Sequence, residues 1–153
     1  MYKKNTKELE KQLVHTHPSK ISEYIHENEA EILSGDRDFM NYMNERIKEK
    51  GLKKQEILLR ADISQGYGYK LLTEEKVTRQ RDIILRICYA AEFTLEETQR
   101  ALQLYRMDSL YVRDPRDALI MACFNQRPGS VIEVNQLLMD NKYKPLKSSG
   151  VQE

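Results

Sequence analysis

Apolar residues recur at helical spacing along most of this chain. Two such stripes lie in residues 3–14 and 18–33, and Pro18 stands in the first turn of the second one. Residues three or four apart share one face of a helix, so the two segments are predicted to form one or two amphipathic helices. The pair Ser34-Gly35 then marks a break. The stripe residues are Leu9 and Leu13 in the first segment and Ile21, Tyr24, Ile25 and Ile32 in the second.

Three further helices are predicted between residues 38 and 73. The first ends at Gly51, a natural helix stop. The next two cover residues 52–60 and 65–73 around a turn at 62–64, where the Ser64 hydroxyl is placed to cap the second helix. The stripe of the first helix is Phe39, Met40, Met43 and Ile47, and the residues expected to pin the following pair to a common core are Leu52, Ile57, Ala61, Ile63 and Leu71.

The second half of the chain contains an internal repeat. Residues 79–107 and 115–141 are each predicted to form a helix hairpin. Helix-start signals support them: Thr94 with Glu97 and Ser130 with Glu133 are capping boxes, and Asp114 precedes a Pro. We favour a duplicated unit over chance agreement, because the matches include caps and Cys as well as apolar positions. The other matched pairs are Arg81/Arg116, Asp82/Asp117, Cys88/Cys123, Tyr89/Phe124, Gln99/Asn135, Leu102/Leu138, Arg106/Lys142 and Leu110/Leu146.

Composition narrows the class of protein. The chain has 153 residues, of which 40% are hydrophobic and 32% charged, with no Trp and four Pro, and this favours an all-α protein with a mixed-charge surface. No apolar run approaches the length of a membrane span, and the first ten residues lack the apolar core of a signal peptide. We therefore expect a cytoplasmic protein with no membrane partner, in which Cys88 and Cys123 are reduced and buried.

Positive charge is concentrated in one region. Residues 51–81 carry seven basic and four acidic side chains, an excess of three, whereas the whole chain has a net charge of +1. A local excess of this kind is the electrostatic footprint of a small element that contacts nucleic acid. An ordinary solvated helical face is the alternative on charge alone.

The stretch LRADISQGYGYKLLTEE lies inside this basic region. Together with IILRICYAAEFTLEET it resembles the Cro/repressor-type helix-turn-helix family (XRE-like, lambda-repressor-like), over residues 38–107 and as a divergent member. The resemblance implies a recognition helix at about residues 65–72 that enters the major groove of DNA. Carried over by position, it implies a backbone contact from Lys54, a helix cap at Ser64, outward-facing turns with Gln65, Gly66, Tyr67, Tyr69 and Lys70, and phosphate proximity for Arg79 and Arg81.

The chain departs from the family pattern at four positions. Asp62 stands where Gly is usual, Leu58 where a small Ala is usual, Gly68 where Ile or Val fills the core, and Leu72 where Glu is frequent. We expect Tyr67 and Tyr69, together with Leu58, to supply the volume missing at Gly68. Gly66 would let the backbone approach DNA closely, although it offers no side chain to a base.

Motifs of catalysis or metal binding are scarce. We find no Gly-rich phosphate loop, no nucleophile elbow and no Ser/His/Asp arrangement at a supporting spacing. His15 and His17 form a pair that a metal could use, but surface histidines are the favoured interpretation because no Cys or carboxylate pattern accompanies them. We expect neither enzymatic activity nor a cofactor.

These observations predict an organisation and a function. We expect a helical leader (1–35), a helix-turn-helix domain (36–110), a second hairpin (111–146) that packs on that domain or mediates dimerisation, and a flexible tail (147–153). The predicted function is a sequence-specific transcriptional regulator that binds double-stranded DNA as a homodimer, with Val131, Val134, Leu137 and Leu138 as the candidate dimer surface; their packing on the first hairpin is the alternative.

Two other functions are weighed against this one. In the first, a degenerate helix-turn-helix acts as an adaptor whose protein partner docks on the leader or on the carboxy-terminal hairpin. RNA binding is the second and has less support, since the tyrosines do not form a recognisable stacking platform.

Overall fold

The computed structural model describes residues 6–33, 35 and 37–148, and in that part of the chain it is all-helical. The chain divides into two compact units, residues 1–38 and residues 39–153. The predicted second hairpin therefore belongs to the same unit as most of the predicted helix-turn-helix domain. Ser34 of the predicted break and residues 149–153 of the predicted tail lie outside the described residues. Among the described helices, none is both long and apolar enough to cross a membrane.

The first unit is a short helical hairpin. Helix α1 spans Thr6–Val14 and α2 spans Ile21–Glu27, with 3₁₀ turns at Pro18–Lys20 and Glu29–Glu31. The predicted helical segment 18–33 is therefore confirmed in part, because α2 covers seven of its residues and 3₁₀ turns flank it. Asn28 ends α2: its side-chain amide donates to the carbonyl of Tyr24 (2.9 Å) and to the side chain of Gln12 in α1 (3.0 Å). Asn competes in this way with helical backbone bonding, so the helix stops where the tie to α1 is made.

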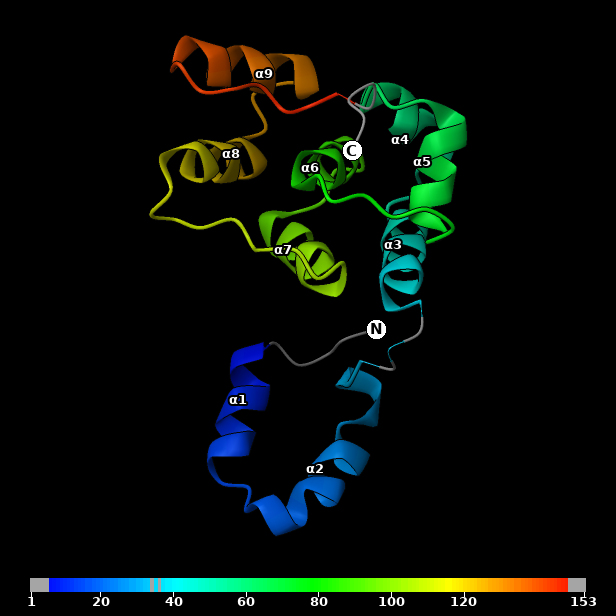
Figure 1. Cartoon of the computed structure of the whole chain (residues 1–153), viewed down its shortest axis with the longest axis vertical. Coiled ribbons are helices and arrows are strands. Elements are labelled where there is room, and N and C mark those ends of the chain that lie inside the picture. The colour runs from blue at the N-terminus through cyan, green and yellow to red at the C-terminus, as the bar shows by residue number, and fades with distance from the viewer. Residues whose placement is uncertain (1–5, 34, 36, 149–153) are drawn as a thin grey trace. The chain divides into compact units, whose positions relative to one another are not determined.

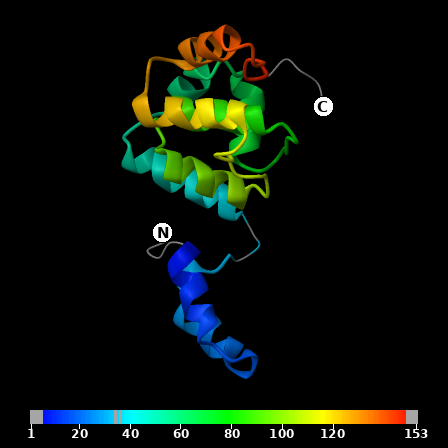
Figure 2. The same cartoon turned by 90° about the vertical axis from the view of Figure 1, so that its left-hand side faces the viewer.

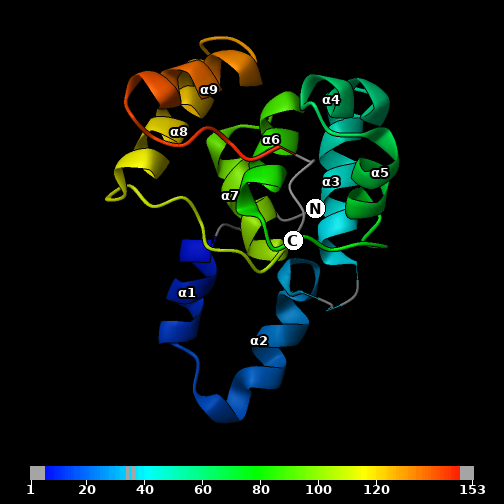
Figure 3. The same cartoon turned by 45° about the horizontal axis from the view of Figure 1, so that its top comes forward.

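The second unit is built around α6. Figures 1 and 3 show α6 and α7 between the helices α3–α5 and the helices α8–α9. Helix α6 contacts α4, α7 and α9, and all of its residues from Asp82 to Ala90 are buried. The bounds are Asp38–Glu49 for α3, Lys54–Arg60 for α4, Gln65–Leu72 for α5, Arg81–Ala90 for α6, Leu95–Leu104 for α7, Pro115–Gln126 for α8 and Val131–Asp140 for α9.

Helix α3 ends just before Gly51, as its sequence predicts. The Glu97 carboxylate joins its carboxyl-terminal end to α7. Gly51 adopts a left-handed φ of 67° just beyond the helix. Glu97 of α7 accepts from Lys50 at 2.8 Å and from Arg46 at 3.3 Å. Burial raises the pKa of Glu97, but hydrogen bonds from Lys50, the Thr94 backbone N–H and Arg46 outweigh burial and hold that pKa below its ordinary value. The carboxylate is thus charged and paired in the folded protein.

The internal repeat is confirmed as two hairpins of the same construction. Helices α6–α7 form one and α8–α9 the other, and in Figure 2 α8 lies between α9 and α7. Both predicted capping boxes are present, at Thr94 and at Ser130, and Asp114 caps α8 ahead of Pro115. Matched positions also share left-handed backbone: φ is 61° at Glu92 and 51° at Arg127, and 60° at Arg106 and 65° at Lys142.

The two hairpins exchange ion pairs in a reciprocal pattern. Arg81 of the first donates to both carboxylate oxygens of Asp117 in the second, at 3.1 and 2.5 Å. Arg116 of the second donates to both oxygens of Asp82 in the first, at 3.2 and 3.0 Å. Such an exchange is expected of two copies related by an approximate twofold rotation, because each then presents the same surface to the other.

The segments that follow the two hairpins repeat this arrangement. Gln99 holds the backbone N–H and carbonyl of Leu110, and the matched Asn135 accepts from the N–H of Leu146. Asp117 accepts from the N–H of Tyr111 at 2.9 Å, and Asp82 accepts from the N–H of Lys147 at 3.0 Å. The structure therefore anchors Lys147, the first residue of the predicted flexible tail.

Three of the four residues expected at a dimer surface are buried within the single chain. Val131, Val134 and Leu138 are buried and Leu137 is half-buried. Helix α9 contacts α8 of its own hairpin and α6 of the first, so these three side chains are buried within the second unit rather than left exposed for a second copy. Cys88 and Cys123 are buried free thiols, as predicted.

Candidate nucleic-acid interface

The turn between α4 and α5 is set by a left-handed residue. Asp62 has a φ of 56°. The backbone N–H of Asp62 donates to the carbonyl of Leu59 (3.1 Å), and that of Ile63 donates to Leu58 (3.0 Å), which closes the carboxyl end of α4. Asp is one of the few residues other than Gly that adopt this conformation readily. The departure from the family pattern at residue 62 thus leaves a sharp turn intact.

The inner faces of α4 and α5 meet at Leu58 and Gly68. Both residues are buried, and a Cβ added at Gly68 would lie only 2.4 Å from Cδ2 of Leu58. Relative to the family pattern, large and small residues have changed places across the contact: Leu for Ala on α4, and Gly for Ile or Val on α5. Leu58 therefore supplies the volume that Gly68 lacks, and α5 needs this glycine because of its neighbour.

The tyrosines beside Gly68 do not share this role equally. Tyr69 is 39% exposed and faces solvent, so its predicted contribution to the missing volume is wrong. Tyr67 is half-buried. The remaining core prediction is confirmed, with Ile57, Ala61, Ile63 and Leu71 buried and Leu52 half-buried.

The outward side of α5 carries most of the predicted recognition residues. Gln65, Gly66, Tyr69 and Lys70 are exposed, and a Cβ at Gly66 would meet nothing within 4 Å. Ser64 occupies the N-cap position and is exposed, but its side chain makes no capping hydrogen bond, contrary to expectation. We call Gln65, Gly66, Tyr69 and Lys70 the α5 face.

Other predicted DNA contacts are dispersed around this helix. Lys54 is the first residue of α4 and is half-buried. Arg79 is exposed in the segment between α5 and α6. Arg81 lies at the start of α6, where Asp117 engages its guanidinium, and its side chain is 25% exposed. The structure gives Arg81 a role in joining the two hairpins, so we leave it out of the interface.

A buried arginine that the sequence did not single out holds the turn. Arg86 on α6 is buried, and it donates to the carbonyl of Ala61 at the end of α4 (3.1 Å) and to those of Leu146 (2.7 Å) and Lys147 (2.6 Å). Burial lowers the pKa of Arg86, an effect that the charges of Asp62 and Asp82 oppose. Its only sequence signal is a charged residue within the apolar run of residues 83–91.

The described residues show no metal-binding group. They contain no group of three His, Cys, Asp or Glu side chains arranged to hold a metal ion. His15 and His17 are exposed, and Nδ1 of His17 accepts from the backbone N–H of Ser19 at 3.2 Å.

Comparisons with protein-family models, with curated proteins and with solved structures give no significant match to this chain.

Proposed function

We propose that this protein is a sequence-specific regulator of transcription that binds double-stranded DNA through α4 and α5, with α5 in the major groove. The observation that carries the proposal is the α5 face, an exposed polar and basic surface on a short helix held by a tight turn. A helix of this length and polarity, packed at one side and open at the other, is what major-groove reading requires.

We propose further that α3–α7 follow the arrangement of the lambda-repressor-like family. Three features support this: the order of five short helices, the left-handed turn at Asp62 and the size exchange between Leu58 and Gly68. Each departure from the family pattern at these positions has a structural compensation. The chain would then be a divergent but intact member.

Roles within the proposed interface follow from exposure and charge. Lys54, Lys70 and Arg79 neutralise phosphates, while Gln65 and Tyr69 meet base edges or the sugar-phosphate backbone. The Tyr67 hydroxyl is a further donor at the edge of the α5 face, and Gly66 lets the α5 backbone come close to DNA. Because one reading unit of this size gives modest affinity, we propose that the regulator acts as a homodimer on two half-sites.

The test is to select bound sequences from a random DNA pool and then to measure the affinity for the most enriched sequence by fluorescence anisotropy. We expect binding that exceeds binding to a scrambled sequence and that falls steeply with salt, because phosphate contacts release counterions. Lys70→Ala should weaken binding to all DNA sequences about equally and lower the salt slope by about one, because it removes one phosphate contact. Lys48→Ala, which removes an exposed lysine from α3 and not from α4 or α5, is the matched control and should bind normally. A pool that yields no retained DNA would overturn the proposal.

A second candidate is a protein adaptor, and one observation favours it. Helix α9 exposes two apolar side chains seven residues apart, Ile132 (77% exposed) and Met139 (49%). Residues at this spacing share one helix face and suit a protein partner. An apolar contact of this kind would tolerate salt that abolishes phosphate-mediated binding, so salt titration separates the two candidates.

A further inference from the structure

Each hairpin repeat borders an open pocket together with the segment that follows it. Residues 142–148 border a pocket of about 1050 Å³, and residues 106–111 border one of about 960 Å³. Both segments are fastened by the same contacts, with Asn135 and Asp82 in one case and Gln99 and Asp117 in the other. The two pockets are therefore built by equivalent backbone.

Their side chains differ in charge at two matched positions. Lys144 of the second repeat corresponds to Asp108 of the first, and Lys147 corresponds to Tyr111. Because the first repeat folds with Asp and Tyr at these positions, the hairpin does not require lysine there. The lysines are a property of this pocket rather than of the fold that makes it.

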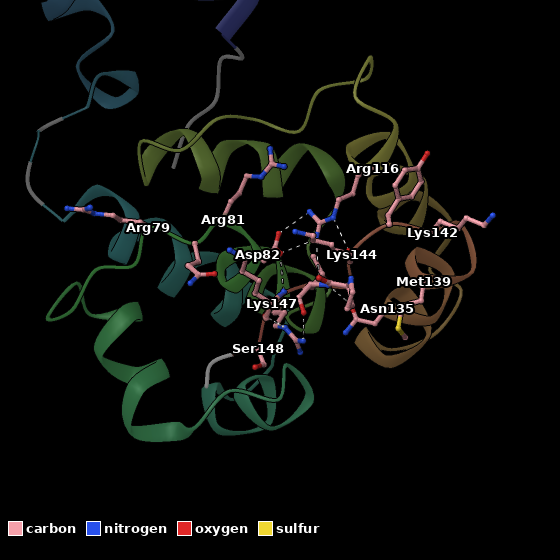
Figure 4. Close-up of a pocket in the computed structure, with 15 residues that line it drawn as sticks. Arg79, Arg81, Asp82, Arg116, Asn135, Met139, Lys142, Lys144, Lys147 and Ser148 are labelled. Carbon is pink, nitrogen blue, oxygen red and sulfur yellow. Dashed lines mark hydrogen bonds and ion pairs between the residues drawn. The ribbon is translucent and has the colours of Figure 1, made fainter. Parts of the chain in front are cut away.

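The second-repeat pocket is strongly basic. Among the described residues, Asp82 is the one acidic residue that lines it, and Arg116 engages both of its carboxylate oxygens. Lys142, Lys144 and Lys147 are exposed at the pocket, and the described part of the chain supplies no ion pair to any of them. Figure 4 shows Lys142 on the side of α9 and the other two lysines nearer Asp82 and Arg116. Three lysines thus border one cavity, and none of the carboxylates among the described residues pairs with them.

The shape of the pocket indicates the kind of anion. Its volume is that of a small-molecule site, and a concavity suits a small ligand better than the convex backbone of a duplex. Met139, Tyr143 and Pro145 give it an apolar side next to the lysines. We propose that this pocket binds a free phosphorylated small molecule of the nucleotide class, with its phosphate groups on Lys142, Lys144 and Lys147.

Isothermal titration calorimetry of the full chain with ATP, and separately with inorganic tripolyphosphate, tests this. The variant Lys144→Asp/Lys147→Tyr copies the first repeat at both positions and so uses residues that the same backbone accommodates. We expect it to weaken binding by about tenfold or more through lost charge-assisted hydrogen bonds. Lys48→Asp/Lys53→Tyr changes the net charge equally at exposed positions outside the pocket and is the matched control. Circular dichroism confirms that each variant is folded.

A second variant protects the test against misfolding. Lys142→Asn removes one ammonium at an exposed position with a φ of 65°, a conformation that Asn tolerates. A smaller loss of affinity is expected from it.

Three results would overturn the proposal. One is that neither probe binds the wild-type chain at millimolar concentration. Another is an equal loss of affinity in the control variant, which would show a general charge effect. The third is DNA binding that falls in Lys144→Asp/Lys147→Tyr while free phosphates do not bind, which would assign the lysines to the DNA backbone. Failure to bind any DNA, with phosphate binding intact, would instead count only against the proposed regulator.

Discussion

Replacing Gly68 by Ala tests whether α5 needs a glycine for packing. Ala favours helix over Gly, so the substitution alone should stabilise α5 by about 0.5–1 kcal/mol. At Gly68, however, the new Cβ would stand 2.4 and 2.7 Å from the two Cδ atoms of Leu58. Carbon atoms in contact prefer about 3.5–4.0 Å, so the side chains must separate by about 1 Å.

The size of the effect follows from these two opposing contributions. Overpacking in a buried site costs about 1–3 kcal/mol, which exceeds the gain in helix propensity. We expect Gly68→Ala to lower the free energy of unfolding by about 1 kcal/mol. Gly66→Ala meets no atom within 4 Å and should raise that free energy by about 0.5–1 kcal/mol.

Urea denaturation followed by circular dichroism measures both variants. Because they place the same side chain in the same helix two residues apart, the difference between them isolates the packing cost against Leu58. Equal stabilisation by Gly66→Ala and Gly68→Ala would show that Leu58 imposes no packing cost on a side chain at residue 68.

The converse exchange provides a second check. Leu58→Ala alone leaves a cavity and should cost about 2–5 kcal/mol. Leu58→Ala/Gly68→Val restores the sizes typical of the family, so the double variant should recover a large part of that loss, with a coupling of about 1 kcal/mol or more. Strict additivity of the two single changes would mean that the residues do not compete for one space.

Three further predictions concern the rest of the second unit. Asp117→Ala and Asp82→Ala should each cost about 3 kcal/mol in urea denaturation, because each leaves an arginine without its bidentate partner, and equivalent losses are expected since the ion pairs are reciprocal. Glu97→Gln should flatten the fall in stability below about pH 4.3, the ordinary pKa of Glu. The pKa of Glu97 is lowered in the folded state, so its contribution is present above that pH and is lost as the pH falls through the lowered pKa. Cys88 and Cys123 should resist a thiol reagent in the native protein and react in urea, because burial raises the pKa of both thiols.

Each of these has an outcome that contradicts it. Losses below about 0.5 kcal/mol for either Asp variant would place it among neutral surface changes. If the stability of Glu97→Gln falls with decreasing pH as steeply as that of the wild-type chain, protonation of Glu97 does not contribute to the loss of stability in acid. Rapid modification of either thiol without denaturant would show that its site opens in the folded state.

Local signals in the sequence were sufficient for most helix positions in the second unit. Capping boxes at Thr94 and Ser130, the Asp114-Pro115 start and the stop at Gly51 all appear where they were predicted. They are reliable because a cap satisfies backbone groups within three or four residues and needs no distant partner. The repeat was visible for a related reason, since its matched caps and apolar positions occur at nearly constant spacing.

Features that depend on contacts between residues far apart in the sequence were harder to predict. The helix expected over 18–33 is interrupted at Asn28, whose side chain bonds to Gln12, a residue sixteen positions earlier. Arg81 was expected near phosphate from the family resemblance, and the structure adds a partner that the sequence did not indicate, Asp117, thirty-six positions later. Neither partner could be chosen from spacing alone, because a charged or amide group pairs with whichever residue the fold brings near it.

Short-range signals in the sequence specify the all-helical class, the helix caps, the repeated hairpin and the turn that precedes a short polar helix. Tertiary structure alone decided that Leu58 fills the space over Gly68, that the hairpins exchange ion pairs, and that Lys142, Lys144 and Lys147 border one pocket. The physical reason is range. Helix propensity, capping and amphipathic spacing act over a few residues, whereas packing volume and charge pairing depend on which distant surfaces meet.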